Sequence, residues 1–356
     1  MIRVLIVDDS PTVRRLLSET LSRADDIEVV GTAPDPYVAR ERIVELRPDV
    51  ITLDIEMPRM DGLTFLARLM EHLPIPVVVL SSLTVRGSEQ AVRALELGAV
   101  EVLCKPASAH SVQDLGEELL RSVRAAAAAR PRVIKVPAGP ATPPSGVRVK
   151  PPPVPLSASR RSGFAASQVL AIGASTGGTE AIRALLERMP ADSPATVIVQ
   201  HLPPMFTASF ARRLNEICAL RVAEASGGED LRPGYAYVAP GGRHLLVVRN
   251  GDRLRLLLDD GPAEHFQRPA VDVLFRSVAA AAGRSAVGVL LTGMGHDGAA
   301  GLLAMRSAGA HTIAQDEATC VVHGMPKAAV ACGGAERELP LPCIADAVQT
   351  LFQGMR

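Results

Sequence analysis

The chain of 356 residues contains no tryptophan, only 3% aromatic residues and five cysteines. The cysteines form no C-x-x-C pair and no even disulfide set, which predicts a reduced chain in the cytoplasm. No apolar run approaches the ~18 residues of a membrane-spanning helix, and the N-terminus lacks the apolar stretch of a signal peptide. We therefore expect a cytoplasmic protein with no membrane insertion.

An excess of one charge sign is also missing, because 38 basic residues balance 38 acidic residues. The balance hides three unlike segments: residues 1–120 carry a net charge of −8, residues 121–179 carry +9, and residues 180–356 carry −1. The middle segment has no acidic residue at all. The C-terminal segment has neither a net positive charge nor a basic recognition helix, so we expect no nucleic-acid partner.

The basic segment is also rich in proline, since residues 131–155 hold nine of the 28 prolines of the chain. Such a run favours polyproline II or coil and cannot bury a core. The length of the chain argues for two domains, because single cores rarely grow beyond ~250 residues. We predict a domain at 1–125, a basic proline-rich linker at 126–165 and a second domain at 166–356.

The first domain alternates strand-like and helical patterns, which predicts five β/α units and a doubly wound parallel sheet. The expected strands are 3–7, 28–31, 50–53, 76–80 and 101–103, and the expected helices are 11–23, 36–46, 62–72, 87–97 and one from about 108. In such a sheet the active edge lies at the carboxyl ends of the strands.

Polar residues stand at those strand ends: Asp8 and Asp9, then Asp54, Ser81 and Lys105. Three carboxylates at one edge repel each other and require a cation, and oxygen ligands favour Mg²⁺. One carboxylate could attack a phosphoryl donor while Lys105 neutralises the transferred oxygens. The plainer alternative is that Asp8 and Asp9 only cap the first helix.

The motifs VDDS (7–10), LDIEMPRMDG (53–62), LSS (80–82) and CKP (104–106) together resemble a two-component receiver domain. The resemblance implies a phosphoacceptor at Asp54 and phosphoryl sensing by Ser81 and Lys105. It also implies a Mg²⁺ site formed by Asp8, Asp9, Asp54 and the backbone carbonyl of Glu56. One departure is Val102, where receivers often carry an aromatic residue of the switch.

The second domain opens with VLAIGASTGGTEAI (169–182), an apolar strand followed by a glycine turn and a helical pattern. Ser175 lies in a G-x-S-x-G pattern, in which small neighbours permit a sharp turn that exposes the hydroxyl and aims amides at an oxyanion. A phosphate or nucleotide loop is an equal alternative from this pattern alone. The absence of G-x-G-x-x-G and GK[ST] forms weakens that alternative.

His201 follows an apolar strand at 196–200. Asp297 lies in AVGVLLTGMGHDGAAG (286–301), a buried strand with a glycine-rich turn and a helix that Asp297 begins. Each has a structural explanation, a strand-end histidine or a helix cap. Together with Ser175 they stand at the ends of three expected parallel strands, which favours a Ser-His-Asp triad. The order Ser, His, Asp differs from that of α/β-hydrolases. We expect a three-layer α/β domain with a mostly parallel sheet.

Six motifs of this domain resemble the catalytic domain of the chemotaxis protein-glutamate methylesterases of the CheB type: GASTGGTEAI, QHLPP, YVAPGGRHL, RPAVDVLF, TGMGHDGAAG and GMPKAA. The order of receiver, linker and esterase is also that of the family. The resemblance implies a nucleophile at Ser175, a general base at His201 and an orienting carboxylate at Asp297. It implies an oxyanion hole from the backbone N–H groups of Thr176 and Met294.

The same resemblance implies the reaction and its partners. The substrates are glutamate methyl esters and glutamines of methyl-accepting chemotaxis receptors, and the phosphodonor is a CheA-type histidine kinase. We expect no cofactor for the esterase, Mg²⁺ for receiver phosphorylation, and a monomer. An adaptor with a degenerate esterase domain is the alternative, which the intact set of Ser175, His201 and Asp297 disfavours.

The remaining histidines have plainer explanations. A structural role is expected for His244, and His296 is expected to face solvent in a turn. His265, His311 and His323 have no carboxylate or cysteine at metal-ligand spacing, so no zinc site is expected.

Overall fold

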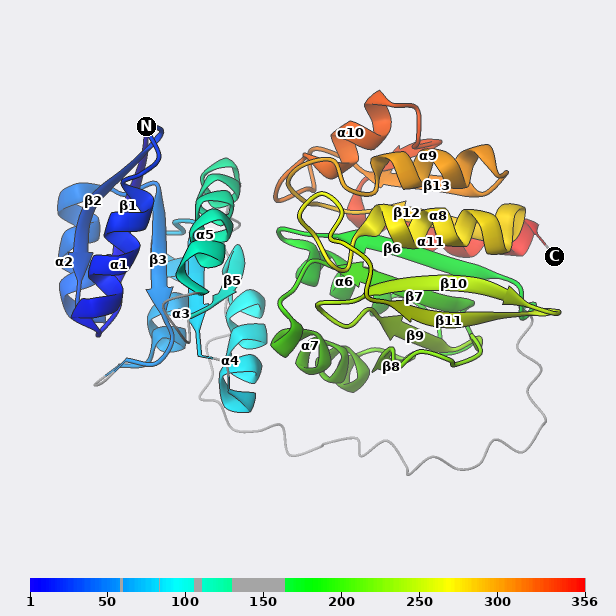
Figure 1. The fold of residues 1–356 in the computed structure, drawn as a ribbon, viewed down its shortest axis with the longest axis horizontal. Helices are drawn as coiled ribbons and strands as arrows, with labels where there is room; N and C mark the ends of the chain where they lie inside the picture. The colour runs from blue at the N-terminus through cyan, green and yellow to red at the C-terminus, as the bar shows by residue number, and fades with distance from the viewer. Residues whose placement is uncertain (58–59, 83, 106–110, 130–163, 356) are drawn as a thin grey trace.

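The computed structural model describes residues 1–57, 60–82, 84–105, 111–129 and 164–355. Two α/β units lie side by side, and each has its own parallel sheet (Figure 1). Most of the predicted linker at 126–165 lies outside the described residues. No described helix is long and apolar enough to cross a bilayer.

The N-terminal unit confirms the predicted doubly wound fold: its five parallel strands follow the order β2-β1-β3-β4-β5. The strands are β1 (Ile2–Val7), β2 (Ile27–Ala33), β3 (Val50–Asp54), β4 (Val77–Ser81) and β5 (Glu101–Cys104). The helices are α1 (Pro11–Leu21), α2 (Pro36–Leu46), α3 (Gly62–His72), α4 (Val85–Glu96) and α5 (Ser111–Ala128). All carboxyl ends therefore meet at one edge.

Helix starts in this unit follow ordinary capping chemistry. Ser10, Asp61 and Thr84 each accept a hydrogen bond from a backbone N–H in the first turn of the helix that follows. Ser10 caps α1, so neither Asp8 nor Asp9 is needed for that role. The capping alternative for these two aspartates is thus wrong.

The C-terminal unit has a parallel sheet of seven strands in the order β14-β13-β12-β6-β7-β9-β8. Its strands are β6 (Val169–Ala174), β7 (Ala195–Gln200), β8 (Arg221–Glu224), β9 (Tyr235–Val238), β12 (Ala286–Leu290), β13 (His311–Gln315) and β14 (Arg337–Leu339). The central strands are buried along their whole length, as expected for a sheet covered on both faces. A separate antiparallel hairpin joins β10 (His244–Asn250) to β11 (Arg253–Asp259).

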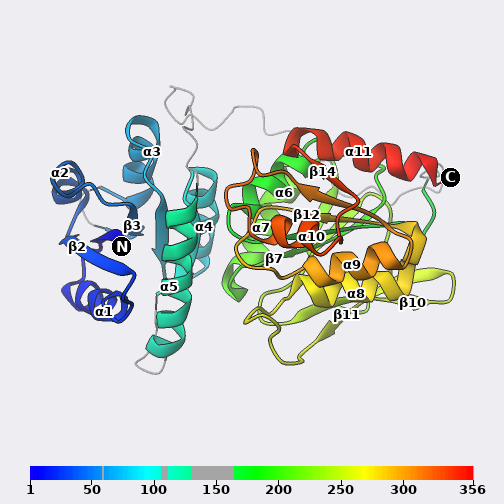
Figure 2. The same ribbon diagram turned by 90° about the horizontal axis from the view of Figure 1, so that it is seen from above.

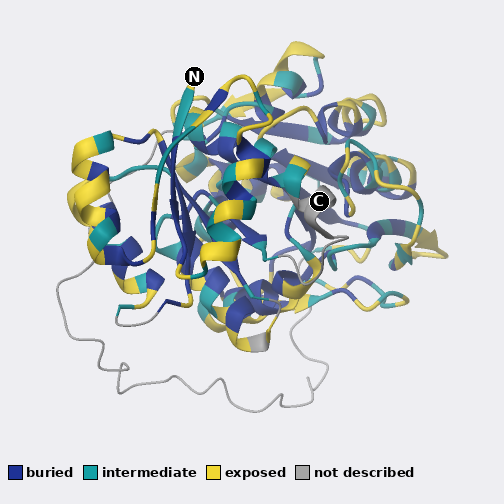
Figure 3. Ribbon diagram, turned by 60° about the vertical axis from the view of Figure 1, so that its left-hand side comes forward, coloured by how far each residue is buried: buried dark blue, intermediate teal, exposed yellow. Residues whose placement is uncertain are grey.

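Helices cover both faces of this sheet and make the predicted three layers (Figures 1 and 2). One face packs against α6 (Gly178–Leu186), α7 (Pro204–Ile217) and α11 (Leu341–Gly354). The other face packs against α8 (Val271–Ala282), α9 (Ala299–Ser307), α10 (Met325–Ala331) and the β10–β11 hairpin; a short 3₁₀ turn, η1 (Gly283–Ser285), follows α8. Buried residues fill the sheets, and exposed residues lie on the outer sides of the helices (Figure 3).

The two units contact each other mainly through α4 and α7. Ser88 and Ser209 share a buried hydrogen bond of 2.8 Å between their hydroxyl oxygens. Arg212 pairs with Glu89 at 2.8 Å on one side of it, and Arg213 pairs with Glu96 on the other. The contact therefore combines these polar pairs with apolar side chains of both units, which belong to one buried cluster.

Candidate active sites

The edge of the N-terminal sheet gathers a cation and two buried carboxylates. Lys105 Nζ lies 2.9 Å from Asp8 Oδ2 and 2.7 Å from Asp54 Oδ2. Burial raises the pKa of Asp54 to about 6, against the opposing effect of Lys105 and with a further rise from Asp8. Burial alone would lower the pKa of Lys105, but its ion pairs with Asp54 and Asp8 raise it. The strand ends thus meet as the sequence predicts.

Asp9 completes an acidic cluster at this edge. One carboxylate oxygen from each of Asp8, Asp9 and Asp54 lies within 4.8 Å of the others. Asp9 is exposed while the other two are buried, so the cluster opens to solvent on one side. Such an oxygen set, with room for water, is typical of a Mg²⁺ site in a receiver domain.

The other expected phosphoryl-site residues lie nearby with partners of their own. Glu56 donates its backbone N–H to Asp54 Oδ1 at 3.0 Å, which leaves its carbonyl for another role. Ser81 is fully buried, and its hydroxyl donates to the carbonyl of Gly87 in the first turn of α4 at 3.0 Å. Ser81 therefore connects the edge of the sheet to the helix that contacts the second unit.

In the second unit, Ser175 stands directly after β6 in a tightly packed turn. Its N–H donates to the carbonyl of Thr292 at 3.0 Å, and its carbonyl accepts from Gly178 at the start of α6 at 2.7 Å. A Cβ on Gly293 would lie 2.8 Å from Ser175 Cβ, so glycine is needed there for the close approach. The strand, sharp turn and helix match the geometry that the G-x-S-x-G pattern predicts.

His201 and Asp297 meet at the same edge. His201 Nε2 lies 2.8 Å from Asp297 Oδ2, and both side chains are buried. β6, β7 and β12 are adjacent and parallel, so their carboxyl ends bring Ser175, His201 and Asp297 together. The bond through Nε2 leaves Nδ1 of His201 as the other ring nitrogen that can carry a proton.

The N-terminus of α8 holds Asp297 in place. Val271 N–H donates to Oδ2 at 2.8 Å and Asp272 N–H donates to Oδ1 at 2.9 Å. Burial alone would raise the pKa of Asp297, but His201 and these two amides lower it. Asp297 therefore caps α8, which precedes it by about 25 residues. The sequence had suggested instead that Asp297 caps the helix that begins directly after it.

The backbone N–H groups of Thr176 and Met294 belong to the turns that follow β6 and β12. Neither donates any of the hydrogen bonds found among the described residues. Thr292 connects the two segments, because its hydroxyl donates to the carbonyl of Thr176 at 2.9 Å while Gly293 precedes Met294. Two backbone donors without a partner near the serine hydroxyl are what an oxyanion hole requires.

Sequence reasoning missed Asp272, whose side chain is buried. Its Oδ1 accepts from Gly301 N–H at 2.6 Å and its Oδ2 lies 2.9 Å from His265 Nε2. His265 therefore has a carboxylate partner in Asp272, the second residue of α8, although the spacing in the sequence did not indicate one. The available signal was the RPAVDVLF motif, in which Asp272 is the only acidic residue.

The other polar residues of interest have structural partners. His244 Nε2 contacts the carbonyl of Pro262 at 2.9 Å, and its Nδ1 accepts from Ala270 N–H at 3.2 Å. His311 pairs with Glu336 and His323 with Glu338, again carboxylates that the sequence spacing does not reveal. His296 is exposed, as predicted.

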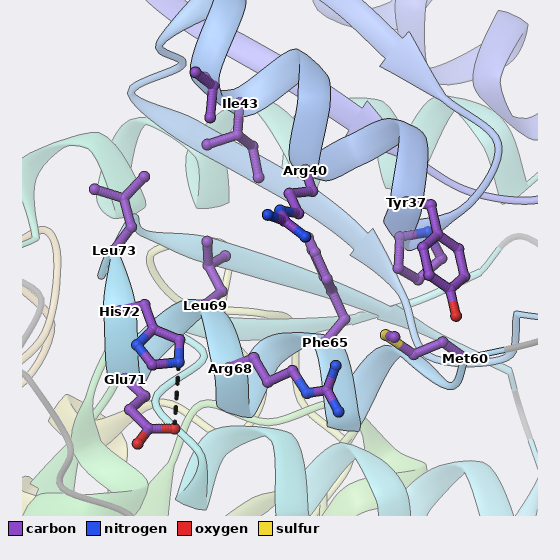
Figure 4. Close-up of a pocket in the computed structure, with 12 residues that line it drawn as sticks. Tyr37, Arg40, Ile43, Met60, Phe65, Arg68, Leu69, Glu71, His72 and Leu73 are labelled. Atoms are coloured by element: carbon purple, nitrogen blue, oxygen red, sulfur yellow. Dashed lines mark ion pairs between the residues drawn. The ribbon is translucent and has the colours of Figure 1, made fainter.

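A largely apolar groove lies between α2 and α3 (Figure 4). Tyr37 and Met60 lie at one end of the groove, and Leu73 lies at the other. His72 and Glu71 form an ion pair of 3.8 Å on its rim. The groove contains no member of either polar cluster, so the chemistry of the molecule lies elsewhere.

A phosphoryl-site edge in one unit and a Ser, His and Asp edge in the other define a class of protein: a response regulator whose output domain is an enzyme. Residues 4–115 match the response regulator receiver domain, and residues 170–348 match the family described as CheB methylesterase. The chain belongs to the CheB methylesterase family, in the form that carries an N-terminal receiver domain.

Named relatives match over nearly the whole chain. It is 50% identical over 347 residues to "Protein-glutamate methylesterase/protein-glutamine glutaminase 2" of Syntrophus aciditrophicus, covering 98% of each chain. It is 53% identical over 347 residues to "Protein-glutamate methylesterase/protein-glutamine glutaminase 1" of Xanthomonas campestris pv. campestris, covering 97% of this chain and 96% of the relative. The crystal structure of the Thermotoga maritima CheB methylesterase catalytic domain covers 52% of this chain and 98% of its own, with 37% identity and a TM-score of 0.51.

Proposed function

We propose that this chain is a phosphorylation-regulated protein-glutamate methylesterase and protein-glutamine glutaminase. It removes methyl groups from glutamate methyl esters of methyl-accepting chemotaxis receptors, and it converts receptor glutamines to glutamates during chemotactic adaptation. The main support for this proposal is the hydrogen bond of 2.8 Å between His201 Nε2 and Asp297 Oδ2, at the edge of the sheet that also carries Ser175. The names of the full-length relatives support the same activities.

Acyl transfer follows from this geometry. Ser175 Oγ attacks the γ-carbonyl carbon of the ester, and its proton passes to Nδ1 of His201, because Nε2 is occupied by Asp297. The carbonyl π bond breaks and its electron pair becomes the oxyanion, which the N–H groups of Thr176 and Met294 stabilise. Asp297 holds the ring in this tautomer and stabilises the imidazolium that forms.

Collapse of the tetrahedral intermediate breaks the ester C–O bond. The imidazolium of His201 protonates the leaving oxygen, and methanol departs from an acyl-Ser175 intermediate. Water then attacks the acyl carbon, His201 takes the proton of the water, and glutamate and free Ser175 result. A γ-carboxamide follows the same steps and releases ammonia, so one site performs both activities.

The receiver edge takes a phosphoryl group on Asp54. Asp8, Asp9, Asp54 and the carbonyl of Glu56 are the residues that would hold Mg²⁺, which supplies charge neutralisation when bound. Lys105 contacts Asp54 directly and is placed to pair with a phosphoryl oxygen. A CheA-type histidine kinase is the phosphodonor.

Regulation passes through α4. The receiver contacts α7, which begins three residues after His201, and Val322 beside the Thr292 hydroxyl packs into the apolar cluster around α5. Ser81 must leave the carbonyl of Gly87 to reach a phosphoryl group on Asp54, and this frees the first turn of α4. The unphosphorylated receiver thus restricts the cleft, and phosphorylation loosens its contact.

The testing experiment measures release of labelled methanol from membranes that contain methylated receptors, with and without a small phosphodonor and Mg²⁺. The wild-type chain should release methanol faster with the phosphodonor. Ser175→Ala should lower the rate on the order of 10³–10⁶-fold. A Ser175→Ala chain that retained most of the activity would contradict the proposal.

A further inference from the structure

A short turn of the C-terminal unit presents an aromatic side chain to solvent. Phe266 is 80% exposed, which makes it the most exposed large apolar side chain among the described residues after Met1. It lies in the loop between β11 and α8, which faces α5 of the receiver in both views (Figures 1 and 2). An aromatic ring held in water at this position needs an explanation.

The backbone of this turn is costly for the residues that it carries. Glu264 and Gln267 exchange both backbone hydrogen bonds, at 3.1 and 2.8 Å, so His265 and Phe266 are the two central residues of a tight hairpin turn. Both have positive φ, 53° and 62°, a conformation that favours glycine or asparagine. A sequence selected only for stability would place Asn-Gly there.

Ion pairs hold the turn against that strain. Arg276 binds both carboxylate oxygens of Glu264, at 2.9 and 2.5 Å. His265 Nε2 lies 2.9 Å from the buried Asp272, whose own N–H donates to Asp297. The turn is thus fixed to the start of α8, which holds Asp297 in place. An aromatic side chain on such a fixed turn is a typical anchor for recognition of a partner.

The ring already has one partner in the resting chain. Arg121 of α5 places its guanidinium carbon 5.7 Å from the centroid of the Phe266 ring, at cation–π distance. Met294, which supplies an oxyanion donor in the proposed mechanism, is also 41% exposed. Phe266 and Met294 are therefore two exposed apolar side chains of this unit, and Phe266 also lies at cation–π distance from the receiver.

We propose that Phe266 is a receptor-binding residue that packs on an apolar side chain of the receptor beside the modified glutamate. The inference rests on the proposed function, because it takes the receptor as substrate. The partner is the receptor segment that carries the ester or amide, and that segment must present an apolar side chain next to the reacting group. The receiver, through Arg121, competes with that segment for the ring.

The test compares two substrates in the full-length chain with phosphodonor and Mg²⁺: methylated receptor in membrane vesicles, and a small soluble ester that is too short to reach Phe266. Phe266→Gly removes the ring and relieves the positive φ, so the variant should unfold at no lower temperature than the wild type. The ratio of receptor demethylation to small-ester hydrolysis should fall roughly 5- to 30-fold, mostly through KM for the receptor.

The matched controls separate the ring from the interface. Arg121→Ala removes the receiver contact but keeps the ring, so that ratio should not fall. Leu257→Ala removes an exposed apolar side chain of β11, 44% exposed, and should leave the ratio at the wild-type value. Phe266→Leu should restore part of the loss.

Three results would overturn the inference: a Phe266→Gly ratio equal to that of the wild type, an equal fall on both substrates, or a marked loss of thermal stability. A different result would disprove the proposed function: a wild-type chain that releases no methanol in a Ser175-dependent way, whatever the Phe266 variants do. The two failures are therefore distinguishable in one set of assays.

Discussion

Replacing Asp297 with asparagine tests how the buried carboxylate orients the histidine. Both of its oxygens act only as acceptors: Oδ2 faces Val271 N–H and His201 Nε2, and Oδ1 faces Asp272 N–H. Asparagine has one acceptor oxygen and one NH₂ donor. In either orientation of the amide, a donor therefore faces a donor at the N-terminus of α8.

The structure sets the size of the effect on stability and on rate. One buried N–H without an acceptor costs about 1–3 kcal/mol of folding stability. Asp297→Asn removes the negative charge beside His201 and no longer favours the tautomer in which Nδ1 is unprotonated. The change should therefore lower kcat by roughly 10²–10⁴-fold, the scale for the orienting carboxylate of a triad. KM for the receptor should change little, because Asp297 is buried beneath the reacting atoms.

Two assays read these effects: methanol release at saturating receptor, and urea unfolding as a function of pH. The pKa of Asp297 is lowered in the folded chain, so its contribution to stability is present above the ordinary carboxyl range and is lost as pH falls through the lowered pKa. The stability difference between Asp297→Asn and the wild type should therefore shrink below about pH 4. His311→Gln, in an exposed pair with Glu336, is the control.

A kcat of Asp297→Asn within threefold of the wild type would refute this reasoning. So would an unchanged urea midpoint at neutral pH, because the amide at α8 would then have found an acceptor that the geometry does not provide.

Other perturbations test the interface, the packing of the serine turn and the receiver edge. Arg213→Glu places like charges against Glu96, so methanol release without phosphodonor should rise about 2- to 10-fold, whereas Arg188→Glu, away from the interface, should not raise it. Gly293→Ala pushes a Cβ against Ser175, so it should lower the free energy of unfolding by about 1–3 kcal/mol and reduce methanol release. The control is Gly354→Ala, where the added Cβ meets nothing within 4 Å. In EDTA, the free energy of unfolding of the receiver should fall by roughly 1–3 kcal/mol as pH rises from about 4 to 6. The reason is that the pKa of Asp54 is raised to about 6, so the folded state holds a proton that the unfolded state has already lost. Urea unfolding of Asp54→Asn should show no such dependence on pH.

Sequence reasoning could predict the parts of both sites that stand directly after strands. Asp54, Lys105, Ser175 and His201 follow buried apolar runs, and parallel strands bring such positions to one edge. Periodicity and turn chemistry are local, so they place these residues without any knowledge of long-range contacts.

Contacts between elements far apart in sequence could not be predicted in this way. The two amides that hold Asp297 come from α8, about 25 residues earlier, and the hydroxyl partner of Ser88 is Ser209, 121 residues later. His265 and Asp272 are only seven residues apart, but they meet only because the turn at 264–267 brings His265 back to the start of α8. These pairs depend on how helices pack, which a single sequence leaves open.

The central claim is that His201 and Asp297 activate Ser175 for covalent catalysis, and the most direct test is chemical. The full-length chain would be treated with a fluorophosphonate ester, and the peptide containing Ser175 would be weighed by mass spectrometry while methanol release is followed. We expect one adduct on Ser175, formed in step with loss of activity and much more slowly in His201→Gln. Activity lost with Ser175 unmodified, or equal labelling in His201→Gln, would contradict it.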